Sequence, residues 1–394
     1  MKVFDFLNHA SIKCHYNGLS VITDPWVISN SFGSWYPNPS PRASDIYEII
    51  DSDEKMGVVV SHGHDDHLDD WFVKHHLKNK LFFCSKFATP GLENRLGKTL
   101  GVDVKPIGDG ATFGEFKFNQ FINPDFTEYD AVVTIETPDY VVIHANDNWH
   151  EWPECMLNPI QEVVKKYDNE NIFLLIQFGV ADCFPVNYEN INKSESSKIL
   201  QNRFEGYLSA TEKNMHALGI NKMYYYANQS LFNYKKTDLD GNSMYELAQK
   251  FLFDNSSTHT QLEPGMAIYR GHKIEHIKEK KRDLFSYCLK ALENFINNAY
   301  KNIVDEDKYI SVRFKTPNED LSKNDINYIA DIEIWNRILI GELNLESIII
   351  GGSGIISKPD INIRDHHIFI SKRAYVAQMM IRKLGLSFFR EHSA

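Results

Sequence analysis

The first third of the chain alternates short apolar runs with turns. Each run holds six to eight residues and is bounded by Gly, Asn, Asp or similar turn-forming residues. This punctuation predicts strands that stack as layered sheets, with helices interspersed. The predicted strands lie in residues 2–7, 11–16, 19–26, 57–62, 80–85, 116–122, 131–137 and 140–147.

Helical patterns enter from about residue 158 onward. The stretch 158–169 has helical spacing, and the largely apolar run over 171–179 predicts another buried strand. The stretch 196–219 predicts a long helix that ends at Gly219, because glycine commonly follows the last turn of a helix.

The last part of the chain has a different character. Residues 283–303 place apolar side chains three or four positions apart, which predicts an amphipathic helix that packs on a neighbour. Mixed strand and helix patterns follow it. We therefore expect a main α/β domain over residues 1–275 and a small α+β extension over residues 283–394.

Composition excludes several classes of partner. Of the 394 residues, 24% are charged and 43% hydrophobic, as in ordinary globular proteins, and the formal net charge is −11. An acidic chain is poorly suited to neutralise phosphates, so we expect no nucleic-acid partner. No apolar run of eighteen residues predicts a membrane span, and the amino terminus lacks the layout of a secretory signal, so the expected compartment is the cytoplasm.

The five cysteines predict no disulfide framework and no cysteine-bound metal. They are scattered and odd in number, and none is paired in a CxxC spacing. We expect them to be mostly buried thiols.

The stretch VVVSHGHDDHLDD, residues 58–70, carries the candidate chemistry. After an apolar strand it places three histidines and four aspartates within nine residues, in the pattern H-x-H-x-D-H. His62 and His64 can converge on one cation, and Asp66 with His67 can reach a second one nearby. A solvated surface turn is the alternative, but four ligand-type residues within six positions favour a metal site.

This pattern resembles that of the metallo-β-lactamase superfamily. The resemblance implies an αββα sandwich, with Asp24 and Pro25 forming a buried turn that braces the metal loop. It also implies that Asp147, after the strand 140–147, is an aspartate that bridges two metal ions. One anion between two cations relieves their mutual repulsion.

The chain departs from the superfamily pattern at two histidines. Where the superfamily places a histidine one strand before the bridging aspartate, this chain has FINPDFTEYD, so the resemblance points to an oxygen donor. Asp125 is the preferred candidate, and Glu128 and Asp130 are the alternatives. The last superfamily histidine also lacks a clear counterpart, and Asp182 or His259 is a candidate for that position.

Carboxylates in place of imidazoles harden the site, which favours iron or manganese over zinc. A narrower resemblance agrees with this bias. DPWVISNSFGSWYPNP, HANDNW and IQFGVADCFPVNY are similar to the branch that contains the CMP-N-acetylneuraminate hydroxylases. The chain shows no Rieske iron-sulfur spacing, so an oxygenase of this kind needs an external electron donor.

The sequence is compatible with three functions. The first is a non-haem diiron oxygenase that hydroxylates a small polar metabolite such as a sugar or nucleotide-sugar. The second is a metal-dependent hydrolase of an ester, amide or phosphoester, in which Asp66 or His9 assists proton transfer. His9 is a candidate because NHAS resembles a loop near the metals of related hydrolases. The third is a binding module whose metal site has decayed. Both enzymes require two divalent metal ions, with iron favoured and zinc or manganese as alternatives.

Overall fold

The structure of the protein is a computed structural model. It describes residues 1–27, 31–32, 35–37, 41–42, 45–46, 49, 55–122, 130–147, 149–177, 184–185, 188, 190–227, 230–232, 251, 258–277, 309–314, 326–331 and 354–357.

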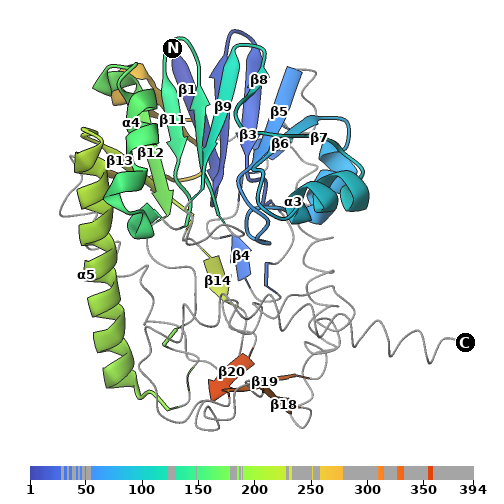
Figure 1. Ribbon diagram of the computed structural model, residues 1–394, viewed down its shortest axis with the longest axis vertical. Helices are drawn as coiled ribbons and strands as arrows, with labels where there is room; N and C mark the ends of the chain where they lie inside the picture. The colour runs from blue at the N-terminus through green and yellow to red at the C-terminus, as the bar shows by residue number, and fades with distance from the viewer. Residues whose placement is uncertain are drawn as a thin grey trace, which may run out of the picture.

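Two mixed β-sheets form the centre of the molecule (Figure 1). The first sheet has the order β17-β16-β1-β2-β3-β5-β6-β7, and the second has the order β15-β13-β12-β11-β10-β9-β8. The strands of the first sheet are β1 (Lys2–Asn8), β2 (Ser11–Tyr16), β3 (Leu19–Thr23), β5 (Lys55–Val60), β6 (Leu81–Cys84), β7 (Asp103–Pro106), β16 (Met266–Tyr269) and β17 (Ile274–His276). The strands of the second sheet are β8 (Ala111–Phe113), β9 (Phe116–Phe121), β10 (Val132–Glu136), β11 (Val141–His144), β12 (Ile172–Gln177), β13 (Met223–Tyr226) and β15 (His259–Gln261).

Each of the eight strands predicted in the first third is present, and so is the buried strand after residue 171. The helix predicted over 196–219 is also confirmed as α5 (Lys193–Ala217), followed by Gly219 at φ +70°. The short strands β7 and β8 were not predicted, because their residues are largely polar or exposed and carry no clear apolar alternation.

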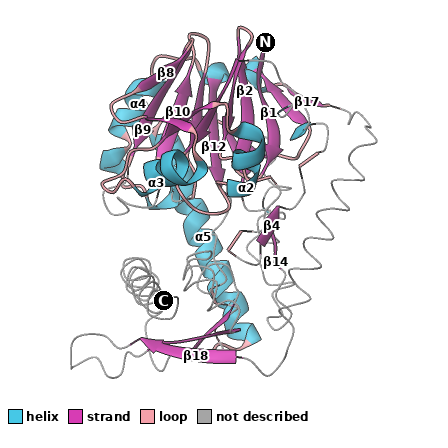
Figure 2. Ribbon diagram, turned by 90° about the vertical axis from the view of Figure 1, so that its right-hand side faces the viewer, coloured by secondary structure: helices cyan, strands magenta, loops and turns pink. Residues whose placement is uncertain are grey.

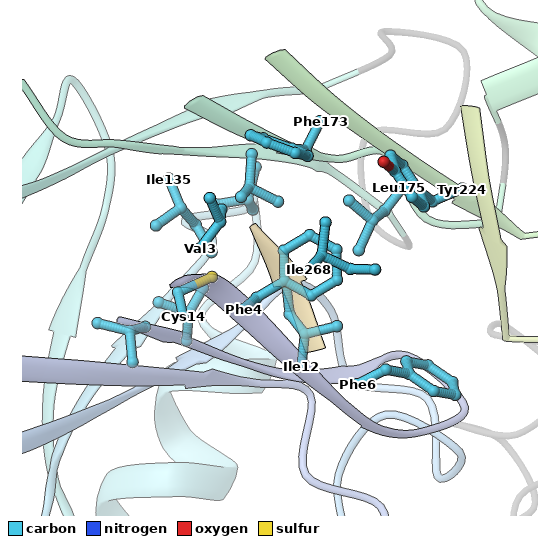
Figure 3. Packing of buried hydrophobic residues seen from close by; sticks show 14 of the residues in the cluster. Val3, Phe4, Phe6, Ile12, Cys14, Ile135, Phe173, Leu175, Tyr224 and Ile268 are labelled. Atoms are coloured by element: carbon cyan, nitrogen blue, oxygen red, sulfur yellow. The ribbon is translucent and has the colours of Figure 1, made fainter. Parts of the chain in front are cut away.

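Alternation along the strands separates three hydrophobic layers. In β12, Phe173 and Leu175 point between the two sheets, whereas Ile172, Leu174 and Ile176 face the helices. Figure 3 shows side chains of both sheets meeting in the central layer, with Phe4 and Ile12 opposite Phe173 and Leu175. This period-two pattern arises because successive strand residues point to opposite faces.

Helices cover the outer face of each sheet. The helices α4 (Asn158–Val164) and α5 pack on the second sheet, on the left in Figure 1. The helices α2 (Asp70–Phe72) and α3 (Gly91–Asn94) pack on the first sheet, and each continues into a wider helical turn, Val73–Leu77 and Arg95–Leu100. The layer order is therefore αββα, which confirms the fold class predicted from the sequence.

Two smaller sheets lie beyond one end of the sandwich (Figures 1 and 2). The strands β4 (Trp35–Pro37) and β14 (Ser230–Phe232) form an antiparallel pair, and β18 (Tyr309–Phe314), β19 (Ile326–Asp331) and β20 (Gly354–Ser357) form an antiparallel sheet. The amphipathic helix predicted over 283–303 lies outside the described residues. The division into domains 1–275 and 283–394 therefore stays a prediction. Among the described residues, no helix combines the length and apolar character needed to cross a membrane.

Candidate metal centre

The metal-ligand motif lies at one edge of the sandwich, where several chain segments meet. β3 and β5 are parallel neighbours, so Asp24 and Ser61, which follow them, lie side by side. β1, β2 and β3 are antiparallel, and this brings the β1–β2 turn at His9 to the same edge. In the second sheet, β11 ends at His144, just before Asp147. The fold therefore converges residues 9, 24, 62–67 and 147 from separate parts of the chain.

Asp24 holds the motif loop from beneath, as the resemblance predicts. One carboxylate oxygen accepts the Ser61 backbone N–H at 2.7 Å, and the other accepts the Ser61 hydroxyl at 2.6 Å and His67 Nδ1 at 2.9 Å. Burial alone raises the pKa of this carboxyl, but the neighbouring imidazoles of His144 and His67 outweigh burial and lower it. The ionised carboxylate thus favours a proton on His67 Nδ1, which would leave Nε2 as the ligand atom when a metal ion is bound.

A first group of ligand atoms comes from His62, His64 and Asp147. His62 Nε2 lies 2.9 Å from His64 Nδ1, and Asp147 Oδ2 lies 3.5 Å and 3.8 Å from these two nitrogens. One ligand atom from each residue fits within a 4.8 Å cluster. A Cβ added at Gly63, between the two histidines, would lie 3.8 Å from Leu92 Cδ1, an ordinary van der Waals distance, so packing does not crowd this position.

A second group of ligand atoms adjoins the first. His67 Nε2 lies 3.3 Å from Asp147 Oδ1 and 4.0 Å from Asp66 Oδ2. His9, Asp66 and His67 form a further buried cluster, in which His9 Nε2 lies 3.3 Å from Asp66 Oδ2. The two oxygens of Asp147 therefore face different groups, which is the arrangement expected of a bridging carboxylate.

These donors fit divalent metal ions on two counts. Ligand atoms about 2.1 Å from a shared ion and about 90–110° apart lie roughly 3.0–3.4 Å from one another, close to most of the separations here. Two of the buried atoms, His67 Nε2 and Asp66 Oδ1, have no hydrogen-bond partner within the described part of the chain. A cation would compensate the cost of leaving such atoms unpaired.

The electrostatic interactions among these groups also fit a bound divalent metal ion. Burial lowers the pKa of His62 to about 4, and the charges of His67 and His64 add to this effect. Burial also opposes charge on His67, but Asp147 and Asp66 raise its pKa well above the ordinary value. Against burial, His67 holds the pKa of Asp147 well below the usual range. A divalent cation here would displace the proton from His67, because metal-bound imidazole must be deprotonated.

Three residues that precede Asp147 in the chain were candidate oxygen donors, and the structure describes one of them, Asp130. It precedes β10, whose antiparallel pairing with β11 brings the two carboxylates to the same end of the sheet, and Asn146 Nδ2 donates to Ala131 O at 2.8 Å. Asp130 Oδ1 lies 3.6 Å from His62 Nδ1, and Oδ2 is buried with no hydrogen-bond partner in the described structure. Burial and the charge of Asp147 raise the pKa of Asp130 well above the usual value. Asp125 and Glu128 lie outside the described residues.

The structure does not bring His259 to the metal centre. His259 stacks on Tyr225, whose hydroxyl lies 2.7 Å from Nδ1, and Nε2 lies 3.4 Å from Glu212 of α5. This position is on the outer face of the second sheet, beneath α5. Asp182, the other candidate for the last histidine position, lies outside the described residues. Trp26, Trp149 and Trp152 are buried in the core.

Sequence reasoning missed a polar network between the sheets. His144 Nε2 lies 2.7 Å from Asp24 Oδ2, and Tyr226 Oη lies 2.8 Å from His144 Nδ1. The Tyr226 hydroxyl also accepts the backbone N–H of Asn146 at 3.2 Å, one residue before Asp147. Alternation along the strands places His144 on the same side as Val142, and Tyr226 on the same side as Tyr224, which is the side that faces the other sheet. The sequence therefore indicated that both side chains point between the sheets, but it did not indicate that the two strand ends lie next to each other.

Comparisons with known proteins give partial similarities. No protein-family model matches the sequence. A 93-residue stretch is 31% identical to a protein of Mycobacterium tuberculosis that carries the name Rieske 2Fe-2S iron-sulfur protein. The match covers 23% of this chain and 17% of that relative, so the chain spans less than a fifth of the curated relative it matches.

Three solved structures illustrate the structural similarity. A possible metal-dependent hydrolase from Veillonella parvula is 14% identical, with 68% of this chain and 99% of that chain covered and a TM-score of 0.43. CmlA, a diiron β-hydroxylase from Streptomyces venezuelae, is 14% identical, with 70% and 54% covered and a TM-score of 0.44. The metallo-β-lactamase fold protein YhfI from Bacillus subtilis is 11% identical, with 68% and 92% covered and a TM-score of 0.35.

The architecture of this chain itself decides its fold class. Its two mixed sheets pack face to face between helical layers, and the H-x-H-x-D-H loop leaves the end of β5 above the buried Asp24. This combination is a metallo-β-lactamase-like fold.

Proposed function

We propose that this chain is a dinuclear-metal enzyme. Of its two candidate activities, we favour that of a non-haem diiron oxygenase over that of a hydrolase. Its substrate would be a small polar metabolite such as a sugar or nucleotide-sugar. The observation that carries the dinuclear proposal is the position of Asp147, with Oδ2 facing His62 and His64 and Oδ1 facing His67.

The proposed roles follow from these contacts. His62 and His64 would hold one ion, together with Asp130 or Asp125. Asp66 and His67 would hold the other, and Asp147 would bridge the two. When bound, the ions would supply Lewis acidity and, as iron, the redox capacity that hydroxylation requires.

The carboxylate share of the donor set supports the oxygenase form. Asp66, Asp130 and Asp147 are hard oxygen donors, which suit iron or manganese better than an imidazole-rich set does. Hydroxylation of R–H by dioxygen consumes two electrons and two protons and yields R–OH and one water. The sequence has no Rieske spacing of Cys and His, so we propose that an external donor delivers the electrons.

A metal-dependent hydrolase of an ester, amide or phosphoester is the second candidate. The observation that favours it is the pair formed by His9 Nε2 and Asp66 Oδ2, 3.3 Å apart in a buried setting. Such a pair can accept a proton from an attacking water and pass it to a leaving group.

Metal analysis separates the two candidates. We expect protein purified without added metal to hold two irons per chain, with near-ultraviolet absorption of a coupled ferric pair. We also expect an EPR signal from the mixed-valent pair after one-electron reduction. Two zinc ions and no iron would overturn the oxygenase and favour the hydrolase. A chain that binds no metal after supplementation with iron, zinc or manganese would overturn both enzyme proposals and leave a binding module.

A further inference from the structure

Among the described residues, no histidine from the later part of the chain joins Asp66 and His67 in a group of candidate ligands. His259 packs beneath α5 on the outer face of the second sheet, so it does not join this group. In the described structure, the histidine next to Asp66 and His67 comes instead from the start of the chain.

His9 occupies a tight turn that fixes its direction. It links β1 to β2 with φ +42°, a left-handed conformation that is uncommon for residues other than glycine. Its carbonyl accepts the Ala227 N–H at 3.0 Å, and the preceding Asn8 donates Nδ2 to Trp26 O at 2.6 Å. Strain of this kind persists only where the surrounding structure determines it, and it concentrates at functional sites.

The imidazole of His9 is buried, and its Nε2 approaches the carboxylate of Asp66. The residue is 3% exposed, and its ring meets Trp26 edge-on with centroids 4.7 Å apart. Neither ring nitrogen has a hydrogen-bond partner among the described residues. A buried imidazole with two unsatisfied nitrogens carries a desolvation cost that a bound cation can offset.

The atoms around His9 Nε2 have the spacing of a shared ion. Nε2 lies 3.3 Å from Asp66 Oδ2, and one ligand atom from each of His9, Asp66 and His67 falls within 4.8 Å of the others. His67 Nε2, which makes no hydrogen bond in the described structure, lies 4.0 Å from the same Asp66 oxygen. Three buried donors thus surround one point, next to Asp147 Oδ1.

We infer that His9 is a ligand of the second metal ion. This inference rests on the proposed dinuclear site and assigns it a ligand from the first β-hairpin. The second ion would then be held by His9, Asp66, His67 and Asp147, and its binding would tie the β1–β2 turn to the motif loop. A His9 bound in this way, like the bound Asp66, would not act as a free base.

Two variants of His9 test the inference while they preserve the turn. Asn tolerates the left-handed conformation, and Gly adopts it freely while leaving a space the size of the imidazole. We expect Zn²⁺ and Mn²⁺ titrations of the metal-free H9N and H9G proteins to show one ion bound as in the wild type. The second ion should bind at least about tenfold more weakly. Added imidazole should restore the second ion to H9G but not to the wild-type level in H9N.

The matched control is His15→Asn. His15 belongs to the same hairpin, but Nε2 pairs with Asp5 Oδ2 at 2.6 Å, and we expect this variant to bind both ions normally. Thermal unfolding of the metal-free proteins shows whether each variant is folded.

The outcomes separate this inference from the proposed function. Wild-type protein that binds two ions, with a folded H9N that binds both equally well, would overturn the ligand role of His9 and leave the dinuclear site standing. Loss of both ions together in folded H9N and H9G would also contradict a role confined to the second ion. Wild-type protein that binds no ion would overturn the proposed function itself.

Discussion

Asp24 shows how one side chain organises the metal centre. Its two oxygens accept hydrogen bonds from the Ser61 backbone, the Ser61 hydroxyl and the imidazoles of His67 and His144. The resemblance predicted Asp24 as a brace for the motif loop, and the contacts with Ser61 and His67 agree. The contact with His144 could not be predicted, because it depends on two sheets meeting face to face.

Asp130 is the residue whose role is most open to experiment. We expect Asp130→Asn to lower the affinity for the ion at His62 and His64 by about tenfold or more, because the buried carboxylate beside His62 is lost. Chelator competition with the purified variants measures the change. Asp125→Asn is the matched comparison, since Asp125 is the residue preferred from the sequence. If D125N lowers the metal affinity and D130N leaves it unchanged, Asp125 and not Asp130 is the ligand.

At the scale of the secondary-structure elements, one arginine outside the loop between β5 and α2 holds that loop by several hydrogen bonds. Arg95, at the start of the turn after α3, donates Nη1 to Gly63 O at 2.6 Å and Nε to Asp70 Oδ1 at 2.9 Å. Nη2 reaches Asp65 Oδ1 at 3.2 Å and Leu68 O at 3.4 Å. One guanidinium therefore spans both ends of the motif. The sequence offered no signal for this contact, which joins residues 25 to 32 positions apart.

Arg95→Lys tests the importance of this clamp. A lysine has one ammonium group and cannot match a planar fork, so we expect two or more of these contacts to be lost. We expect the free energy of unfolding to fall by about 1–3 kcal/mol. Hydrogen exchange should rise over residues 61–70. Urea denaturation and exchange mass spectrometry measure the two effects, with Lys98→Arg on the same helical turn as control. Unchanged exchange over 61–70 would contradict the clamp.

At the scale of the whole molecule, burial of titratable groups couples stability to pH. His259 is 5% exposed beneath α5, and burial, assisted by the charge of His216, lowers its pKa to about 4. Glu212 is near but partly exposed, so solvent screens its opposing charge. In the unfolded chain the same imidazole titrates near its ordinary value of about 6.5.

The sign of the pH effect follows from these two pKa values. Between about pH 6.5 and pH 4 the unfolded chain binds a proton at His259 that the folded chain does not. The contribution of His259 to stability is therefore complete above pH 6.5 and declines as the pH falls toward 4. We expect the difference in unfolding free energy between wild type and His259→Gln to shrink over this range. Urea unfolding at several pH values measures it, and a difference independent of pH would contradict the assignment.

The sequence by itself determined the strands β1, β2, β3, β5 and β6 of the first sheet, β9 to β12 of the second, the helix α5 and the H-x-H-x-D-H motif. These features are local, since alternation along a strand, helical spacing and ligand spacing within one loop are written in neighbouring residues. It also indicated Asp24 and Asp147 through a resemblance to a known superfamily.

Only the tertiary structure decided which distant residues share the site. It brought His9 from the first turn to Asp66, joined His144 to Asp24, placed Asp130 beside His62 and kept His259 on the opposite face of its sheet. The physical reason is that these contacts depend on strand order, register and the packing of two sheets. Those properties arise from pairings between segments far apart in the chain, and no local pattern encodes them.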